Sequence, residues 1–345
     1  MSPTAPIAGQ FRHTKSKTQI QASKKGDFYK MEKVKPYILK LEPAFKDYIW
    51  GGRRLIDEYK MDCNLERLSE AWVLSCHKDG PSTVKNGPLC GKTLEEAIGS
   101  FSGKPCGEHC DRFDFFPVLI KLIDAKRDLS IQVHPDDNYA AKHEGGYGKT
   151  EMWYVVDCDE GASIYYGFKK EISKEDFRRS IEENTLTDLL KRIEVKKGDC
   201  FFIPAGTVHA IGAGMLIAEI QQSSNSTYRV YDYGRLGTDG KPRELHIEKA
   251  LDVAVTAPAK AHDYENGDIL ADCQYFKAEK KNIGGQFDFV ADGTSFVAVL
   301  AVDGKGNISG GGESLSFSAG DCFFVPAKTG ECRISGEAVC IFVTV

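Results

Sequence analysis

Two polar side chains in the apolar run LSIQVHP (129–135) have a spacing that lets them bind the same ligand. Gln132 and His134 are separated by one residue. On a β-strand, residues with this spacing project from the same face. Pro135 follows directly and is expected to end the strand, because proline cannot donate a hydrogen bond to a sheet ladder. The run therefore predicts an amide and an imidazole side by side at the end of a strand.

Two further residues of metal-binding type stand beside other apolar runs. Glu151 opens the run EMWYVV, and His209 follows the turn-forming sequence PAGTV. Together with Gln132 and His134 they would supply two nitrogens and two oxygens, a set suited to a borderline divalent cation such as Zn²⁺. The alternative is that Gln132 pairs with a neighbouring backbone group and that His134 caps a turn. Spacing alone leaves both interpretations open.

The other histidines and two loop motifs are weaker candidates. His77, His143, His246 and His262 stand in polar or turn-like surroundings, and His13 lies in a polar N-terminal stretch. The motif CGEHC (106–110) has no second cysteine or histidine pair at the spacing of a zinc site, and we expect it to be an exposed loop. The motif EGGYGKT (144–150) resembles a phosphate loop, but it lacks the first glycine and the strand that should precede it.

Composition excludes several classes of protein. The net charge of −5 gives no reason to expect a nucleic-acid partner, although a local positive site could still bind an anionic small molecule. No stretch approaches the ~20 apolar residues of a membrane span. The eleven cysteines are scattered and odd in number, which indicates a reducing, cytoplasmic location without a disulfide framework. The sequence carries no prediction of oligomeric state.

Short apolar runs separated by Gly, Pro, Asn and Asp fill most of the chain after residue 34. This pattern predicts an antiparallel sandwich or barrel. Because the few helical patterns do not alternate with strands, a parallel α/β fold is not expected. The predicted strands are 71–75, 116–123, 129–135, 151–156, 201–204 and 215–222, and the predicted helices are 94–101, 174–193 and 246–255.

One segment occurs twice. GDCFFIPA, beginning at Gly198, is repeated as GDCFFVPA, beginning at Gly320. Only the first copy continues to a histidine, His209. We therefore predict two copies of one β-unit: residues 34–244 as a catalytic domain with a helix at about 174–193, and residues 245–345 as a second domain without a metal site. Residues 1–33 are predicted to be a disordered leader, because such a polar stretch buries too little apolar surface to fold.

Several blocks resemble the signature motifs of one enzyme family, the type I mannose-6-phosphate isomerases. They are SIQVHPD (130–136), KTEMWY (149–154) and PAGTVHA (204–210), followed by AEIQQSSNSTYRVYDYGR (218–235), which is similar to the short bacterial form. The resemblance implies a mainly β, double-cupin fold with a few peripheral helices. It also implies one zinc ion bound by Gln132, His134, Glu151 and His209, and the interconversion of mannose 6-phosphate and fructose 6-phosphate.

The same resemblance implies roles for four more residues. Arg229 matches the arginine placed against the reacting carbons, and Lys149 matches a lysine of the active site. Ser130 and Lys121 match residues that bind the substrate phosphate. The base that moves the carbon-bound proton stays open among Asp136, Asp232 and Glu219. Other interpretations of the chain are a cupin isomerase or epimerase for another sugar or sugar phosphate, and a sugar-phosphate sensor without catalysis.

Overall fold

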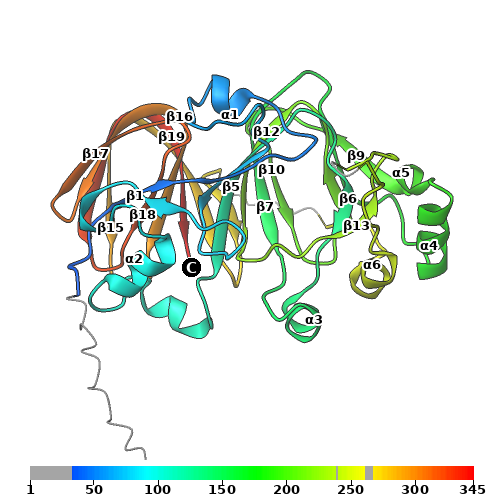
Figure 1. The fold of residues 1–345 in the computed structure, drawn as a ribbon, viewed down its shortest axis with the longest axis horizontal. Helices are drawn as coiled ribbons and strands as arrows, with labels where there is room; N and C mark the ends of the chain where they lie inside the picture. The colour runs from blue at the N-terminus through cyan, green and yellow to red at the C-terminus, as the bar shows by residue number, and fades with distance from the viewer. Residues whose placement is uncertain (1–32, 238–239, 261–266) are drawn as a thin grey trace, which may run out of the picture. The chain divides into compact units, whose positions relative to one another are not determined.

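The computed structural model describes residues 33–237, 240–260 and 267–345, and all but the last residue of the predicted leader lies outside them. Within these ranges the strands form three antiparallel sheets of eight, six and five strands (Figure 1). The prediction of a mainly β, cupin-type fold with peripheral helices is confirmed. None of the described helices is long and apolar enough to cross a membrane.

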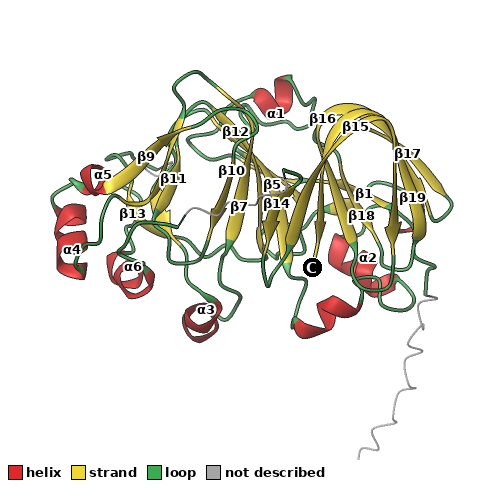
Figure 2. Cartoon of the chain, turned by 180° about the vertical axis from the view of Figure 1, so that it is seen from behind, coloured by secondary structure: helices red, strands yellow, loops and turns green. Residues whose placement is uncertain are grey.

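The six-stranded sheet lies between the other two sheets and is covered on both faces (Figures 1 and 2). Its central strands are buried along their whole length, which is why they read as continuous apolar runs in the sequence and not as an alternating pattern. In sheet order its strands are β10 (Cys200–Ile203), β7 (Glu151–Cys158), β12 (Met215–Gln222), β5 (Val118–Ala125), β3 (Glu70–Leu74) and β2 (Ala44–Lys46).

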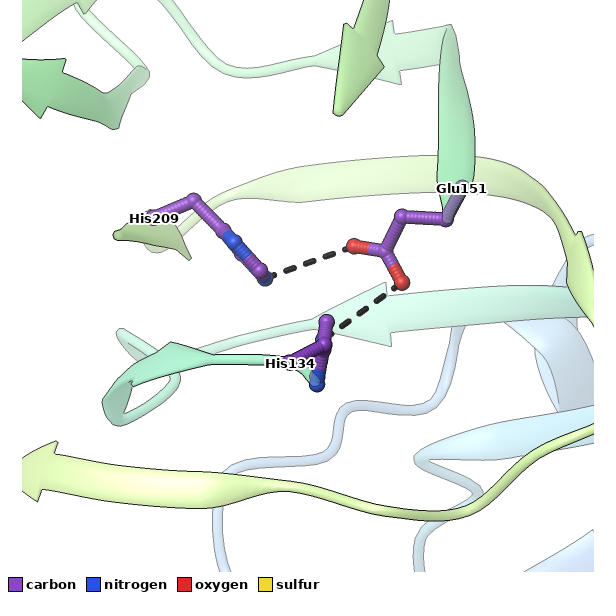
Figure 3. A group of neighbouring side chains, drawn as sticks. All are labelled: His134, Glu151 and His209. Atoms are coloured by element: carbon purple, nitrogen blue, oxygen red, sulfur yellow. Dashed lines mark ion pairs between the residues drawn. The ribbon is translucent and has the colours of Figure 1, made fainter. Parts of the chain in front are cut away.

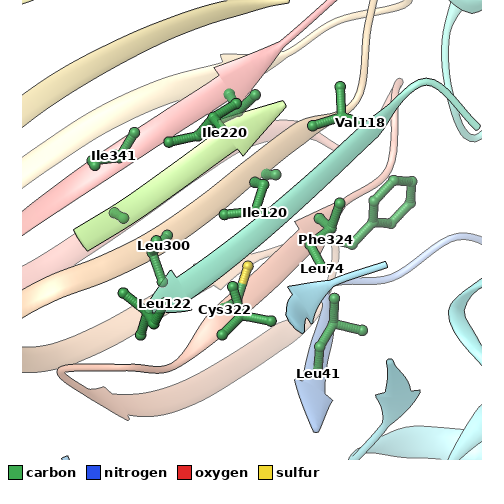
Figure 4. Close-up of a cluster of buried hydrophobic side chains, with 14 of the residues drawn as sticks. Leu41, Leu74, Val118, Ile120, Leu122, Ile220, Leu300, Cys322, Phe324 and Ile341 are labelled. Atoms are coloured by element: carbon green, nitrogen blue, oxygen red, sulfur yellow. The ribbon is translucent and has the colours of Figure 1, made fainter. Parts of the chain in front are cut away.

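The largest core fills the space between this sheet and the eight-stranded sheet. Ile120 and Leu122 of β5 pack there against Leu300 and Phe324 (Figure 4). In sheet order the eight-stranded sheet contains β14 (Ile269–Asp272), β15 (Lys277–Ala291), β19 (Gly330–Thr344), β16 (Val297–Gly310), β18 (Cys322–Val325), β1 (Leu39–Glu42) and β4 (Thr83–Val84), and β17 (Glu313–Ser318) pairs with β16 off this path.

Three long strands of the eight-stranded sheet have glycines side by side. Gly285 of β15 pairs with Gly336 of β19, which pairs in turn with Gly306 of β16. Gly336 has a φ of +133°, and a Cβ there would lie 2.4 Å from the carbonyl oxygen of Lys305. Glycine at a strand interior marks a bend or a close backbone approach. We call these three residues the glycine row. The long strands of this sheet curl over and enclose a second core between the two halves of the sheet (Figure 1).

The five-stranded sheet contributes one face to the interior and carries helices on the other. Its inner face packs against the six-stranded sheet, and helices α4 (Lys174–Glu182), α5 (Leu186–Leu189) and α6 (Ile247–Val253) cover its outer face (Figure 1). In sheet order its strands are β13 (Tyr228–Tyr231), β6 (Ile131–Val133), β11 (His209–Ile211), β8 (Ser163–Phe168) and β9 (Leu190–Glu194).

Two of the three predicted helices are confirmed, and the helix predicted at 174–193 is wrong in its second half. It ends at Glu182, and Asn184 takes a left-handed φ of +58° that breaks the helical path. A single further turn follows, and the chain then enters β9, where Ile193 pairs with Ile164. The helices are α1 (Arg54–Asp57), α2 (Leu94–Ser100), α3 (Asp137–His143), α4 (Lys174–Glu182), α5 (Leu186–Leu189) and α6 (Ile247–Val253), with 3₁₀ turns at Gly87–Leu89 and Glu108–Arg112.

The repeated GDCFF segment forms the same turn twice. Gly198 and Gly320 have φ values of +92° and +95°. The amide of Gly198 donates to the carbonyl of Val155, and the amide of Gly320 donates to the carbonyl of Ala301, both at 2.8 Å. Each turn is followed by an apolar strand, β10 in the first copy and β18 in the second. The internal duplication seen in the sequence is therefore a duplication of structure.

Sheet membership does not follow the predicted domain boundary between residues 244 and 245. Strand β1, close to the start of the described chain, pairs with β18, so that Leu39 lies opposite Phe324. The described residues from Lys33 onward form one compact unit. The division into two domains stays a prediction.

Candidate active site

His134 and His209 present the same ring nitrogen to one point in the interior. Nδ1 of His134 lies 2.8 Å from the carbonyl oxygen of Ser226, and Nδ1 of His209 lies 2.9 Å from that of Thr207. A carbonyl only accepts hydrogen bonds, so the proton of each ring is on Nδ1 and the lone pair is on Nε2. Both rings are therefore oriented as metal-binding histidines usually are, with Nδ1–H tied to the backbone.

Glu151 completes a group that can hold a metal ion. Its Oε1 lies 3.3 Å from Nε2 of His209, and its Oε2 lies 3.6 Å from Nε2 of His134 (Figure 3). All three side chains are buried, and their candidate ligand atoms lie within 4.8 Å of one another. Oε1 of Glu151 receives no hydrogen bond from any described residue. A buried carboxylate oxygen without a donor is costly, and a bound cation would remove that cost.

Gln132, the fourth predicted ligand, lies in the same row of side chains. It pairs with His209 of β11 on one side and with Arg229 of β13 on the other. Directly opposite residues of antiparallel strands share a face, so the amide, the imidazole and the guanidinium lie next to each other. Nε2 of Gln132 is 3.4 Å from Nε2 of His209. The amide can turn to present its oxygen in place of its nitrogen, because either orientation fits the same volume.

The ammonium group of Lys149 places a positive charge next to His134 and Glu151. The ammonium donates to Oε2 of Glu151 and lies 3.0 Å from Nε2 of His134. A second lysine, Lys121, lies 2.9 Å from Oε1 of Glu219, its partner across β5 and β12. Both lysines and both glutamates are buried, so each charge depends on its neighbour for stabilisation.

Burial and these charges shift the pKa values of the group. Burial, helped by Lys149, lowers the pKa of His209 to about 3 and that of His134 well below its usual value. Burial raises the pKa of Glu151 to about 7 although Lys149 opposes the shift. Burial also acts to raise the pKa of Glu219, but Lys121 and Lys149 lower it to about 2. The histidines are neutral near pH 7, which is the state that binds metal.

A pocket of about 310 Å³ opens beside the row of ligands. Gln132, Lys149 and Arg229 line it, together with further residues between Tyr48 and Arg243. Nε of Arg229 donates to Oγ of Ser130 at 3.2 Å, so the two residues form one wall. The rest of the lining consists of Tyr48, Trp50, Glu70, Lys121, Ile123, Leu129, Ser130, Ile211, Glu219, Asn225, Thr227 and Arg243. All eight predicted site residues therefore lie either in the metal-capable group or in the wall of the adjoining pocket.

Comparisons with known proteins give the family. Residues 38–161 match the model of the phosphomannose isomerase type I catalytic domain, and residues 267–345 match that of the mannose-6-phosphate isomerase cupin domain. A Bacillus subtilis (strain 168) protein named "Probable mannose-6-phosphate isomerase GmuF" is 42% identical over 311 residues, which cover 86% of this chain and 95% of that protein. The chain belongs to the type I phosphomannose isomerases.

Further members of the family agree with this assignment. The mannose-6-phosphate isomerase ManA of the same Bacillus strain is 38% identical over 316 residues, or 87% of this chain and 96% of that protein. The crystal structure of a mannose 6-phosphate isomerase from Bacillus subtilis superposes with a TM-score of 0.81 at 38% identity and covers 89% of this chain and 99% of that one. The family predicted from the signature blocks is confirmed.

The second cupin copy of this phosphomannose isomerase has other residues at the positions of the candidate ligands. Ile203 and Val325 occupy the same position in the two repeated segments. Ile203 pairs with Glu151, whereas Val325 pairs with Val297, so Val297 takes the place of Glu151 in the second copy. His209 corresponds in the repeat to Glu331. A valine in place of the carboxylate removes a ligand.

The weaker candidates from the sequence lie elsewhere. His143 stacks on Tyr139 at the end of α3, and Nδ1 of His246 accepts from the amide of Arg229. His109 lies on a 3₁₀ turn against the C-terminus, and His13 and His262 fall outside the described residues. Lys149 precedes a strand and follows a helix, the reverse of the order in a phosphate loop.

Sequence reasoning missed part of the pocket wall. Glu70 and Trp50 line the pocket, but neither stands in a run with a recognisable spacing. Arg243 lies in an irregular stretch after β13 and was not singled out. Its only signal is chemical: it is one of three arginines close together in the sequence, with Arg229 and Arg235.

Proposed function

We propose that this isomerase interconverts mannose 6-phosphate and fructose 6-phosphate at the pocket lined by Gln132, Lys149 and Arg229. The observation that carries the proposal is the row His209–Gln132–Arg229, which places a metal-capable group and a fixed cation side by side. Exchanging an aldose with a ketose creates negative charge on an enediolate. A preorganised cation beside the reacting carbons stabilises that charge.

We also propose that one Zn²⁺ ion is the cofactor and that Gln132, His134, Glu151 and His209 hold it. The donor set of two nitrogens and two oxygens fits Zn²⁺, although other divalent ions also accept such ligands. The unsatisfied Oε1 of Glu151 and the Nδ1-protonated state of both histidines support the fit. A zinc-bound mannose 6-phosphate isomerase structure, 15% identical to this chain, shares the fold with a TM-score of 0.72. A bound cation would supply Lewis-acid polarisation of substrate oxygens.

The side chains around the pocket divide the remaining tasks. Arg229 stabilises the developing negative charge, and because it stays protonated it cannot serve as the base. Lys149 is placed to move protons between the substrate oxygens. Ser130 and Lys121, which line the same pocket, are proposed to bind the phosphate end of the substrate.

Of the three acids considered for the carbon base, the geometry favours Glu219. Asp136 caps α3 by accepting a hydrogen bond from Tyr139, and Asp232 is held by Arg235 and Arg243. Glu219 is also held, by Lys121 and Trp153, but it lines the pocket. A candidate base must reach the proton that it removes, and among these three only Glu219 lines the pocket.

The second cupin copy is proposed to be structural, with no metal site, because Val297 and Glu331 replace ligand types found in the first. The chain is proposed to act in the cytoplasm on a small sugar phosphate, without a nucleic-acid or membrane partner. Its described cysteines are all free thiols, as expected in a reducing compartment.

The deciding experiment is a coupled assay of fructose 6-phosphate conversion to mannose 6-phosphate, run with and without chelator and alongside metal analysis. We expect about one Zn²⁺ per chain and an activity that chelation abolishes and zinc restores. Activity that survives complete removal of metal would contradict the cofactor assignment. A fully metal-loaded protein that turns over no hexose phosphate would instead favour a sensor, and preference for another sugar would favour a different cupin isomerase or epimerase.

A further inference from the structure

We propose that Arg243 is a substrate-binding residue that, with Ser130, anchors the 6-phosphate group. This inference rests on the proposed function, because it concerns the orientation of the same substrate in the same pocket. It adds a cationic anchor at the rim of the pocket, supplied by the stretch between β13 and α6.

The guanidinium of Arg243 is held in a fixed position at the wall of the pocket. Its Nε and Nη2 donate to the two carboxylate oxygens of Asp232 at 2.7 and 2.5 Å. This bidentate pair does not use Nη1. The side chain of Arg243 keeps 21% of its surface exposed, whereas that of Asp232 keeps 6%. Asp232 therefore acts as a buried clamp that leaves one edge of the guanidinium available to a ligand.

The rim around Arg243 has an excess of positive charge. Asp232 is shared by Arg243 and Arg235, so one carboxylate serves two guanidinium groups. Arg229 lies close enough that Arg243 is, after burial, the largest cause of its lowered pKa. Arg229 forms no ion pair with any carboxylate of the described ranges, and its guanidinium donates only to Ser130 Oγ and the carbonyl oxygen of Glu244. A dianionic phosphate would relieve this repulsion and accept the free donors.

Lys121, proposed above to contact the phosphate end, would need a further cation to bind a dianion. Lys121 is paired with Glu219 and lies 3.8 Å from Glu70, so nearby carboxylates already balance its charge. Lys149 is paired with Glu151 in the same way. An incoming dianion there would face these carboxylates as well as the lysines. At the rim, three arginines (Arg229, Arg235 and Arg243) face two acids, Asp232 and Glu244, so positive charge is in excess there.

The length of the substrate fits this placement. Ser130 and His134 flank β6, two residues before and after Gln132, so the three side chains project to the same side of the extended segment. At ~3.3 Å per residue, Ser130 lies about 13 Å from His134 along the chain. In a hexose 6-phosphate the reacting carbons and the phosphate are at opposite ends of the molecule. With C1 and C2 near His134 and Gln132, the phosphate points toward Ser130 and the arginine rim.

The test compares metal-loaded wild type with Arg243→Ala and Arg243→Lys, using mannose 6-phosphate as substrate and inorganic phosphate as a competitive inhibitor. Loss of charge-assisted hydrogen bonds to phosphate predicts a KM about 10- to 100-fold higher for Arg243→Ala, and a similar rise in the inhibition constant of phosphate. The turnover number should change less than about threefold, because binding and not chemistry is affected. Arg243→Lys keeps the charge without the planar fork and should be intermediate.

Arg333→Ala is the matched control, because Arg333 is an exposed arginine paired with Asp288 in the second copy. It should leave KM and phosphate inhibition unchanged. If Arg243→Ala does not fold, as judged by circular dichroism, the lysine variant decides. Unchanged KM and phosphate inhibition in a folded Arg243 variant would overturn the inference, as would a loss confined to the turnover number. An inactive wild type would refute the proposed function instead, which separates the two failures.

Discussion

At the scale of single residues, backbone carbonyl groups orient the two histidine rings of the candidate metal site. The carbonyl groups of Ser226 and Thr207 fix the tautomers of His134 and His209, and neither carbonyl belongs to a residue with a chemical role of its own. Both ε-nitrogens then point at the carboxylate of Glu151 (Figure 3). Replacing Ser226 or Thr207 would therefore change little, since the group that matters is the peptide carbonyl.

Replacing Arg229 should separate metal binding from catalysis. Because Arg229 lies beside Gln132 without being a metal ligand, Arg229→Ala should keep its zinc. The turnover number should fall by at least about 100-fold, since the charge that develops in the reaction loses a preorganised partner. Zinc content by atomic absorption and steady-state kinetics check the two halves of this prediction.

The control for Arg229→Ala is Glu151→Gln, which should lose metal and activity together. Arg229→Lys should recover part of the lost turnover, because it restores the charge without the planar guanidinium. An Arg229→Ala variant with wild-type turnover would refute the assigned role. A variant without zinc would show that Arg229 supports the metal site.

Much of the site could be predicted at this scale, and the limits have a physical cause. Residue type and local spacing made Gln132, His134, Glu151 and His209 candidates, but only the resemblance of the surrounding blocks to a known family favoured the metal-binding interpretation. The ion pair of Lys121 with Glu219 depends on the register of β5 against β12, which no local pattern contains. Arg243 was missed for the same reason, since its position depends on Asp232.

At the scale of elements, the two fully buried strands β5 and β12 were predicted well, whereas the edge strand β9 was predicted to be helical. The runs at 116–123 and 215–222 correspond to β5 and β12, whose apolar content reflects burial on both faces. The error at 174–193 arose because the segment leaving α4 contains good helix formers, although it forms an edge strand. Pairing of β9 with β8 and the left-handed Asn184 outweigh a weak intrinsic preference there.

The glycine row gives a prediction for the eight-stranded sheet. Gly336→Ala should lower the free energy of unfolding by about 3 kcal/mol, because its Cβ meets backbone atoms of Lys305 and Gly306 at a positive φ. Urea unfolding monitored by tryptophan fluorescence measures the change as a shift of the midpoint.

Gly285→Ala is the matched control in the same row. It also has a positive φ, +94°, but a Cβ there meets no atom within 4 Å. We expect Gly285→Ala to lower the free energy of unfolding by about 1 kcal/mol, from backbone strain alone. Equal losses for both variants would contradict a role for the close approach at Gly336, and no loss for either would remove the requirement for glycine.

At the scale of the whole molecule, the buried cluster should make the metal-free protein sensitive to acid. Both histidines have lowered pKa values, so below about pH 6.5 the unfolded chain binds two protons that the native chain does not. Glu151 acts in the opposite sense, because its pKa of about 7 lets the native chain keep one proton that the unfolded chain has lost. The unfolded chain therefore binds one proton more than the native chain. Between about pH 6.5 and 4.5, the contribution of this cluster to the free energy of unfolding falls by about 1.4 kcal/mol for each pH unit of acidification.

Urea titrations of chelated protein between about pH 5 and 7 measure this slope. In His209→Gln one of the two histidine protons is removed, and the contribution of the cluster should become nearly flat. A wild-type protein that grows more stable on acidification through this range would contradict the assignment of neutral histidines. With zinc restored, the free energy of unfolding should fall more steeply as pH falls, because protons then compete with the metal for the same nitrogens.

The pairing of β1 with β18 also has a consequence for how the protein is made. Leu39 leaves the ribosome long before its partner Phe324, because the two residues are far apart in the sequence. At a synthesis rate of ~5–20 residues per second, β1 waits on the order of tens of seconds for that partner. During this time only β4, a neighbour in the nascent chain, can cover one of its edges. The eight-stranded sheet can close only after β18 has been synthesised.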